Sequence, residues 1–333
     1  MRSARALAVF AAASALAGCS RSDFRSFIDD ERAPYIDTDS MGVVPTNPLR
    51  IRTEARANLV ENSAATLSRT QPGVFFTIND SGNDPMLFAL DTTGADRGAW
   101  RVLGARNADW EAASVGPCGV ASPTDTMPPH DCVYIGDVGD NSASRSSRTI
   151  YRVREPDAQQ RGVTGTLLAQ HLTFRYEDEP HDVEAMYVAP NADTFLLTKR
   201  RLLTVRNRRR PSLVFRIGAS EWAADTTVVA QLVDSLPIVP GSAPMRQITD
   251  AALSPDGHLL AVRTYAQVYV FQTDSSTGRV RGAIPPSICN IVPLGRWQGE
   301  GVAWFGRSGK LLLTSEGQGS PMFAVDCPMP RSE

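Results

Sequence analysis

The sequence predicts an all-β protein, a β-propeller built from four-stranded antiparallel blades. One pattern recurs along the chain: an acidic, turn-prone start, an apolar run, a turn, and a second apolar run. The acidic positions of its copies are residues 61, 111, 184, 250 and 300, so the copies are 50, 73, 66 and 50 residues apart. Each copy is followed by a further short apolar run. Four-stranded units that recur at such a period are typical of propeller blades.

The pattern is clearest between His181 and Arg200, which reads as two strands joined by a Pro-Asn-Ala-Asp turn. In an antiparallel hairpin the start of the first strand lies opposite the end of the second. We therefore expect Asp182 and Glu184 to lie near Lys199 and Arg200. The same unit is found at Val60–Gly82, Asp109–Asn141, Thr249–Tyr265 and Gly299–Gly317. The copy at Val60–Gly82 is weaker, and the copy at Asp109–Asn141 has a longer hairpin loop.

Further strands are expected after each hairpin. The third strands are predicted at Met86–Leu90, Thr149–Val153, Leu213–Ile217, Val268–Phe271 and Met322–Val325. Fourth strands are predicted at Leu167–Phe174 and Thr226–Val233, for example. The fifth unit has no clear fourth strand of its own, and Leu49–Arg56 is expected to supply it and close the ring. The count is five blades, and six stay possible because a divergent blade would fit into either long spacing.

The first 18 residues have the features of a lipoprotein signal peptide. Arg2 and Arg5 precede a short apolar segment, Ala6–Ala17, which ends in Leu-Ala-Gly-Cys at Cys19. This resembles the bacterial lipobox, in which the cysteine is lipidated after cleavage; an ordinary secretory signal is the alternative. Ser20 follows, so the resemblance implies an outer-membrane lipoprotein on the periplasmic side or at the cell surface. Residues 19–48 read as the lipidated cysteine with a flexible tether, and residues 49–333 as a single propeller domain.

Charge and cysteine content narrow the function classes. Without Arg2 and Arg5 the chain keeps 32 of its 34 basic residues against 36 acidic ones, which argues against nucleic acid as a partner. The expected partners are the membrane, through Cys19, and a small-molecule, glycan or protein ligand of a monomeric protein. The four other cysteines show no metal-binding CxxC pair. We expect Cys118–Cys132 and Cys289–Cys327 disulfides in an oxidising compartment, although four cysteines allow three pairings.

Polar residues at the strand starts and ends of one disc face form the candidate site. In the units that begin near 184 and 250 an acid faces a base, whereas in the other three units an acid faces an acid. Crowded carboxylates take up a proton or a cation, and oxygen ligands suit Ca²⁺. The candidate metal ligands are Asp80, Glu111, Asp137, Asp140, Glu300 and Glu316. The candidate ligand-binding residues are Asp109, Asp182, Glu184, Lys199, Asp250 and Arg263. The alternative is that these acids only order turns, in which Asp, Asn and Gly are common.

Familiar catalytic signatures are absent from the sequence. It contains no HExxH, GxSxG, P-loop or strand-linked GxGxxG motif, so no catalytic residue is assigned. The four histidines are scattered, and His181, on the candidate face, is expected to be a surface residue rather than a general base.

The segments PGVFFTINDSG, ARNADWEAASVGP, YIGDVGDN, HDVEAMYV, ITDAALSPDG and GEGVAW together resemble a largely uncharacterised family of secreted bacterial β-propeller lipoproteins. The resemblance covers Val60 to Gly317. It implies the fold and no activity. A remoter similarity to phytase-like and NHL-type propellers is one of fold only.

Three functions follow as hypotheses. The first is a ligand-binding propeller that holds its ligand, through Ca²⁺, at an acidic channel mouth. The second is a metal-assisted hydrolase of a phosphate or other ester, in which Lys199 or Arg263 holds an anionic group. The third is a non-enzymatic scaffold that binds protein or glycan across the disc face.

Overall fold

The computed structural model describes residues 42–54, 56–119, 130–199, 212–238, 247–282, 284–295, 298–305 and 309–330. The chain divides into two units, Met1–Tyr35 and Ile36–Glu333, and the described residues all belong to the second. The predicted signal peptide, Cys19 and Arg200 lie outside the described residues.

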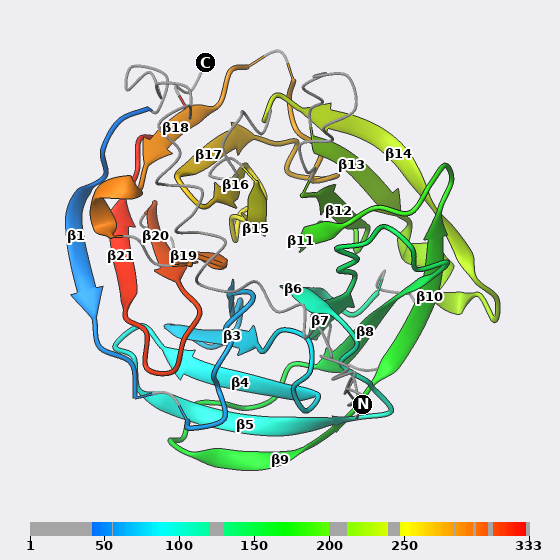
Figure 1. Cartoon of the computed structure of the whole chain (residues 1–333), viewed down its shortest axis with the longest axis horizontal. Helices are drawn as coiled ribbons and strands as arrows, with labels where there is room; N and C mark the ends of the chain where they lie inside the picture. Colours follow the sequence, from blue (N-terminus) through cyan, green and yellow to red (C-terminus); the bar gives the residue numbers. More distant parts are fainter. Residues whose placement is uncertain are drawn as a thin grey trace, which may run out of the picture. The chain divides into compact units, whose positions relative to one another are not determined.

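The described residues form five blades arranged as a ring (Figure 1). From the inside outwards, the strands in each blade fall into four ranks. The innermost are β2 (Thr66–Leu67), β6 (Trp110–Pro117), β11 (Val183–Val188), β15 (Ile248–Leu253) and β19 (Gly301–Phe305). The second are β3 (Val74–Ile78), β7 (Asp131–Asp137), β12 (Thr194–Thr198), β16 (Leu259–Thr264) and β20 (Lys310–Thr314). The prediction of an all-β propeller with five blades is confirmed.

The third strands lie where they were predicted. They are β4 (Met86–Asp91), β8 (Arg148–Arg154), β13 (Ser212–Ile217), β17 (Gln267–Gln272) and β21 (Met322–Asp326). The outermost are β5 (Asp96–Leu103), β10 (Gln170–Tyr176), β14 (Val228–Leu236), β18 (Ser287–Asn290) and β1 (Thr46–Ile51). We number the blades 1 to 5 by their innermost strands, β2, β6, β11, β15 and β19.

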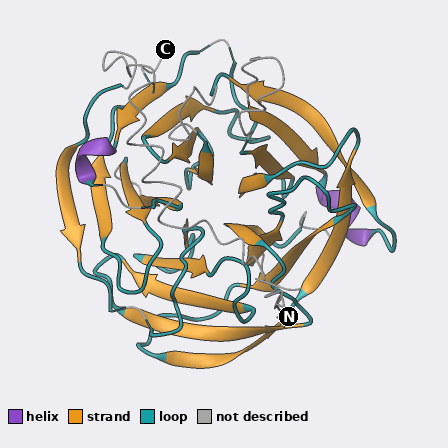
Figure 2. Ribbon diagram, in the orientation of Figure 1, coloured by secondary structure: helices purple, strands orange, loops and turns teal. Residues whose placement is uncertain are grey.

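Helix is limited, among the described residues, to two short 3-10 segments, η2 (Ala219–Ala223) and η4 (Val292–Leu294) (Figure 2). The strands are rich in β-branched and aromatic residues, which suit a pleated, buried surface. In β3, Phe75 packs against blade 5 while its neighbour Phe76 packs against blade 2. Because successive side chains point to opposite faces of a strand, a strand between two other blades must be apolar throughout. A separate apolar core fills each of the five spaces between neighbouring blades.

The ring closes through the N-terminal strand. β1 pairs antiparallel with β21 and becomes the outermost strand of blade 5, as Figure 1 shows with the blue and red strands side by side. The predicted closing strand is therefore present, but it spans Thr46–Ile51 rather than Leu49–Arg56.

The predicted strand Leu167–Phe174 is two strands in the structure. β9 (Val163–Leu168) pairs in parallel with β5 of the preceding blade, and β10 pairs with β8 of blade 2 and in parallel with β14 of blade 3. This exchange lengthens the second repeat, so its long spacing conceals an extra outer strand and not a sixth blade among the described residues.

Both predicted disulfides are present. Cys118 and Cys132 are joined within blade 2, and Cys289 of β18 is joined to Cys327, which follows β21. The second disulfide therefore connects blade 4 to blade 5 beside the ring closure.

Candidate functional site

The candidate site is the mouth formed where the inner strands begin. At the start of β6 and of β11 the pairing with the next strand shifts by one residue, and Glu111 and Glu184 are the extra residues. Such bulges redirect a side chain. Glu300 stands at the same place in blade 5, directly before β19. All three are buried, with 6 %, 2 % and 4 % of their surface exposed.

Lys199 lies among these three glutamates. Its Nζ is 2.7 Å from Glu184 Oε1, which confirms the predicted contact across the hairpin of blade 3. Burial lowers the pKa of Lys199, but Glu184, Tyr265, Glu111 and Glu300 together raise it more, so its pKa lies well above the ordinary value. Lys199 therefore stays protonated and offsets one of the three carboxylates.

Burial is the main cause of the altered acidity of the glutamates. It raises the pKa of Glu184 to about 7, although Lys199 acts in the opposite direction. The pKa values of Glu111 and Glu300 are raised well above the ordinary value by burial and then by the charges of Glu184 and Glu316, respectively. An excess of buried negative charge favours uptake of protons or of a cation.

Three carboxylates from two blades converge at one side of the mouth. Asp80, in the turn after β3, and Asp109 and Glu111, at the start of β6, each offer one oxygen, and these oxygens lie within 4.8 Å of one another. Burial and then Asp80 raise the pKa of Asp109 to about 6, and burial raises the pKa of Asp80. We call Asp80, Asp109 and Glu111 the carboxylate triad.

The surroundings of the triad keep its side chains together. Ser63 Oγ donates a hydrogen bond to Glu111 Oε2 at 2.9 Å. Gly139 faces the triad directly, since a Cβ built on it would lie 2.6 Å from Asp109 Cγ and 2.7 Å from Glu111 Cγ. A residue with a side chain at 139 would have to displace these carboxylates.

Asp137 and Asp140 lie at the same face but are held by arginines. Asp137 forms an ion pair with Arg145 at 2.8 Å and accepts the backbone N–H of Asp109 at 3.1 Å. Asp140 pairs with the buried Arg148. Asp182 Oδ1 accepts the backbone N–H of Asp140 at 2.9 Å. These aspartates position the loop that carries Gly139 against the triad.

Asp250 and Arg263 connect blades rather than lining the mouth. Asp250 Oδ2 accepts the backbone N–H of Ala65 at 3.1 Å and that of Val302 at 2.8 Å, so one carboxylate of blade 4 binds blades 1 and 5. Arg263 Nη1 donates to the carbonyls of Gly301 and Thr314 at 2.5 Å each.

The sequence did not indicate that Asp250 and Arg263 connect blades. Both are buried, and burial lowers the pKa of Arg263 to about 10. Register places them opposite each other, as the hairpin argument predicted.

Sequence reasoning missed Tyr265 and misjudged His181. Tyr265 stands one residue beyond β16, as Lys199 stands one residue beyond β12, and burial and then the charge of Glu300 raise its pKa. Because the two positions are equivalent in their hairpins, Tyr265 could have been identified from the sequence. His181 is buried against Tyr176 and Phe215 and contacts Asp178 at 2.9 Å, so the expectation that it is a surface residue was wrong.

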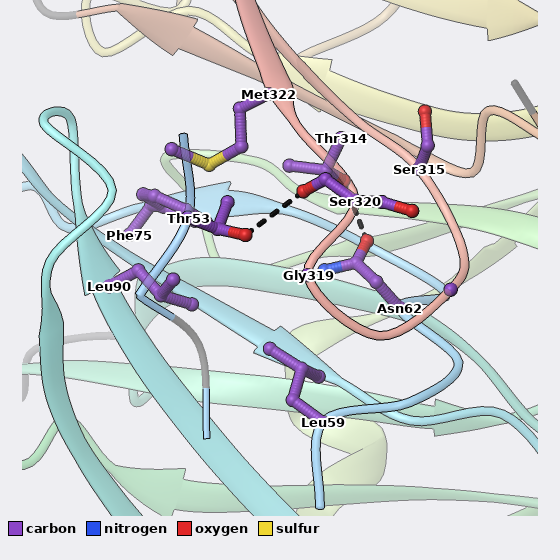
Figure 3. Close-up of a pocket in the computed structure, with 11 residues that line it drawn as sticks. Thr53, Leu59, Asn62, Phe75, Leu90, Thr314, Ser315, Gly319, Ser320 and Met322 are labelled. Carbon is purple, nitrogen blue, oxygen red and sulfur yellow. Dashed lines mark hydrogen bonds between the residues drawn. The ribbon is translucent and has the colours of Figure 1, made fainter. Parts of the chain in front are cut away.

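A small hollow lies between blades 1 and 5 (Figure 3). Its walls are the apolar side chains of Leu59, Phe75, Leu90 and Met322, and a hydrogen bond joins Thr314 and Asn62 at one side. Its volume of about 20 Å³ suffices for about one water molecule. The hollow therefore does not extend the candidate site.

No helix in the described part of the chain has the length and apolar character needed to cross a membrane.

Comparisons with known proteins concern the fold alone. No protein-family model matches the sequence, and no curated protein matches it. Among solved structures, glutaminyl cyclase from Myxococcus xanthus is similar with a TM-score of 0.44 and 14 % identity over 85 % of this chain and 98 % of that chain.

Two further solved structures are similar at the same level. The PQQ-bound aldose sugar dehydrogenase from Streptomyces coelicolor has a TM-score of 0.45 and 13 % identity over 84 % of this chain and 98 % of that one. The β-propeller domain of Cps50 (Swd1) from Myceliophteria thermophila has a TM-score of 0.38 and 10 % identity over 85 % and 99 %. The blades of the structure itself define the class of protein, a β-propeller.

Proposed function

We propose that this protein is an outer-membrane lipoprotein whose propeller binds a ligand through a hard divalent cation, Ca²⁺, at its acidic mouth. The observation that supports the cation most is the carboxylate triad, whose three oxygens lie within 4.8 Å of one another. A ligand that reaches the mouth would complete the coordination of the cation.

The chemistry of the triad suits calcium. Its donors are all carboxylate oxygens, and Ca²⁺ takes six to eight oxygen ligands in a flexible arrangement, whereas zinc prefers nitrogen and sulfur. The remaining ligands would come from water, backbone carbonyls or the bound molecule. A cation would also offset the repulsion among Asp80, Asp109 and Glu111.

The anchoring part of the proposal rests on the N-terminal sequence. The charged start, the apolar segment and the Leu-Ala-Gly-Cys ending at Cys19 together support lipidation at this cysteine. The two disulfides are in keeping with an exported protein, because disulfides persist in oxidising compartments. In a cell fractionation experiment, Cys19→Ser should move the protein out of the membrane fraction; retention in that fraction would contradict lipid anchoring.

A metal-assisted phosphoester hydrolase is the second candidate, and one observation favours it. Lys199 has three N–H donors, and the described residues accept one of them, through Glu184. The others are available to an anionic group beside the cation. Arg263 is a poorer candidate for that role because it already binds two backbone carbonyls.

The test is calcium binding by the full chain purified in mild detergent. A ligand at about 100 times its Kd adds about 2.7 kcal/mol to the stability of the folded state. We therefore expect the melting temperature to rise with Ca²⁺ and to fall with EDTA.

The matched variants are Asp80→Asn, which alters the triad, and Asp84→Asn, which alters an exposed carboxylate in the same loop. Asp84 contacts Arg101 and its side chain is 69 % exposed. Calcium should stabilise Asp84→Asn as it does the original protein and should have little effect on Asp80→Asn. If Ca²⁺ does not bind, or binds equally to both variants, the triad is not the cation site. Phosphoesters would be screened with the calcium-loaded protein.

A further inference from the structure

A groove of about 670 Å³ lies at the outer edge of the propeller and shares no residue with the candidate site. Its walls come from residues 49–54, at the end of β1, and from residues 92–93, in the turn between β4 and β5. The backbone N–H of Glu54 donates to Gly94 O at 2.7 Å and joins the two segments. β1 is the outermost strand of blade 5 (Figure 1). The volume lies in the range of small-molecule sites, about 300–1,000 Å³.

Two arginines of this rim groove have no partner in the described part of the chain. Arg50, in β1, and Arg52, directly after it, are exposed, and neither side chain forms an ion pair or hydrogen bond with a described residue. Side chains two positions apart on an extended chain share a face and lie about 7 Å apart. Glu54, the acid among the lining residues, is 3.7 Å from Arg161 instead. The groove therefore has an excess of positive charge, in a chain whose net charge is −2.

The groove suits a phosphate group that is attached to an apolar body. The planar guanidinium of arginine bonds two phosphate oxygens at once. Thr92, whose hydroxyl binds no described residue, supplies a further donor. Leu49, which stands beside Arg50 in the wall, is 59 % exposed and offers an apolar contact. Val43 and Val44, which precede β1, are also exposed, at 61 % and 50 %.

We propose that the rim groove binds the phosphate group of an anionic phospholipid, with Arg50 and Arg52 on the phosphate and Leu49 against the apolar part of the lipid. Basic residues near an anionic membrane surface are attracted to it, and apolar side chains beside them enter the interface between headgroups and acyl chains.

The phosphate chemistry stands on the groove alone. The membrane lipid as its source rests on the proposed function, because β1 is the first strand after the lipid anchor proposed at Cys19. The 31 positions from Cys19 to Arg50 can span up to roughly 100 Å. The anchor is therefore long enough for the groove to meet the membrane surface.

Flotation with vesicles of phosphatidylglycerol and phosphatidylethanolamine tests the groove on the full chain with Cys19→Ser, which lacks the proposed anchor. Residues 1–18 are the same in every variant, and vesicles of phosphatidylcholine, which have no net charge, measure the binding that is independent of anionic lipid. Arg50→Glu/Arg52→Glu should weaken binding to the anionic vesicles about tenfold or more.

The matched control is Arg154→Glu/Arg281→Glu, which makes the same charge change at two exposed arginines outside the groove. It should bind the anionic vesicles as the Cys19→Ser chain does. Arg50→Gln/Arg52→Gln is a milder second variant should the charge reversal disturb β1, and circular dichroism verifies that each variant folds.

Two further measurements distinguish a lipid from free phosphate. Leu49→Ser should weaken vesicle binding, whereas Leu168→Ser, which alters a 79 % exposed leucine of β9, should not. Inorganic phosphate should displace the protein from the vesicles no better than sodium chloride of the same ionic strength. If inorganic phosphate displaces it better, and Leu49→Ser binds the vesicles as Leu168→Ser does, the groove takes free phosphate and the lipid source is overturned.

The outcomes separate this inference from the proposed function. If the Arg50→Glu/Arg52→Glu variant and its control bind the vesicles alike, or if the Cys19→Ser chain binds anionic and neutral vesicles alike, the groove is not a lipid site and the anchor is unaffected. In cell fractionation, a wash at high salt releases a chain that is held by arginines but not one that is held by a lipid anchor. Release of the original protein by that wash would overturn the anchor and leave the groove supported.

Discussion

Lys199 Nζ lies 2.7 Å from Glu184 Oε1, so a buried ammonium at the end of one strand meets a buried carboxylate at the start of its neighbour. Removal of one partner from a buried ion pair costs about 3–5 kcal/mol, because the other charge is left without compensation. Lys199→Met should therefore lower the free energy of unfolding. The pKa of Glu184 is about 7, so the loss should be smaller at pH 5, where Glu184 is protonated, than at pH 8.

Urea denaturation at the two pH values measures this loss. The double variant Glu184→Gln/Lys199→Met also removes the carboxylate that Lys199 binds and should recover much of the stability. Equal stability of Lys199→Met and the original protein at pH 8 would contradict the importance of the pair.

The acidic mouth predicts how stability depends on pH. Folding raises the pKa of Asp109 from 3.8 to about 6 and that of Glu316 from 4.5 to about 7. A raised pKa means that the folded state binds protons more tightly than the unfolded state, so the stabilisation is present at low pH and is lost as pH rises through the folded values. Without calcium, these groups should make the protein less stable at pH 7.5 than at pH 5.

Melting temperatures measured in EDTA across pH 5 to 8 give the test. The proposed calcium ion would bind the deprotonated carboxylates, so its stabilising effect should grow over the same interval and offset the loss. A melting temperature in EDTA that rises steadily from pH 5 to 7.5 would contradict the proposed shifts.

Gly139 should be needed for cation binding more than for folding. A methyl group at this position meets Asp109 and Glu111 at less than 3 Å, and the carboxylates would have to move apart. Gly139→Ala should weaken Ca²⁺ binding about tenfold or more, an effect of about 1.4 kcal/mol, as measured by calorimetry. Gly282→Ala is the matched control, because a Cβ there meets nothing within 4 Å. The prediction fails if the two variants bind calcium alike.

The Cys289–Cys327 disulfide should contribute more to stability than the Cys118–Cys132 disulfide. The first closes a loop of 38 residues and the second a loop of 14. A chain-entropy estimate gives about 4 and about 3 kcal/mol, respectively. Paired serine variants of each disulfide, compared by urea denaturation, measure the difference. The order would be contradicted if Cys118→Ser/Cys132→Ser were the less stable variant.

The local part of this architecture could be read from the sequence. Each hairpin, such as the one between Glu184 and Lys199, is formed by neighbouring residues whose alternation and turn residues specify the pairing. The disulfides could be anticipated because Cys118 and Cys132 flank one loop. The closing strand could be anticipated because the fifth unit lacked a fourth strand of its own. The bounds of this strand differ from the prediction by three to five residues, because strand ends are the least determined part of a periodic pattern.

The contacts that determine the site are mostly not local. Asp250 looks like one more acid at a strand start, but three blades meet around it and its hydrogen bonds go to Ala65 and Val302. Arg145 and Arg148, which bind Asp137 and Asp140, lie in the sequence after the Asp109–Asn141 hairpin. Tyr265, two residues beyond Arg263, is uncharged at neutral pH, so the pattern of acids and bases in the hairpins does not indicate it. Contacts of this kind depend on how the blades converge, and the sequence of a single repeat does not specify that arrangement.

The pairing of β1 with β21 also has a consequence for how the protein is made. Asn47 and Asp326, which are hydrogen-bonded at this seam, are 279 residues apart in sequence. A growing chain exposes β1 long before β21 exists, and an unpaired strand edge readily pairs with other chains. Contacts of such long range also form slowly. During synthesis the first strand must therefore be shielded until β21 has been made. Completion of the C-terminal blade is then the step that commits the whole chain to its native state.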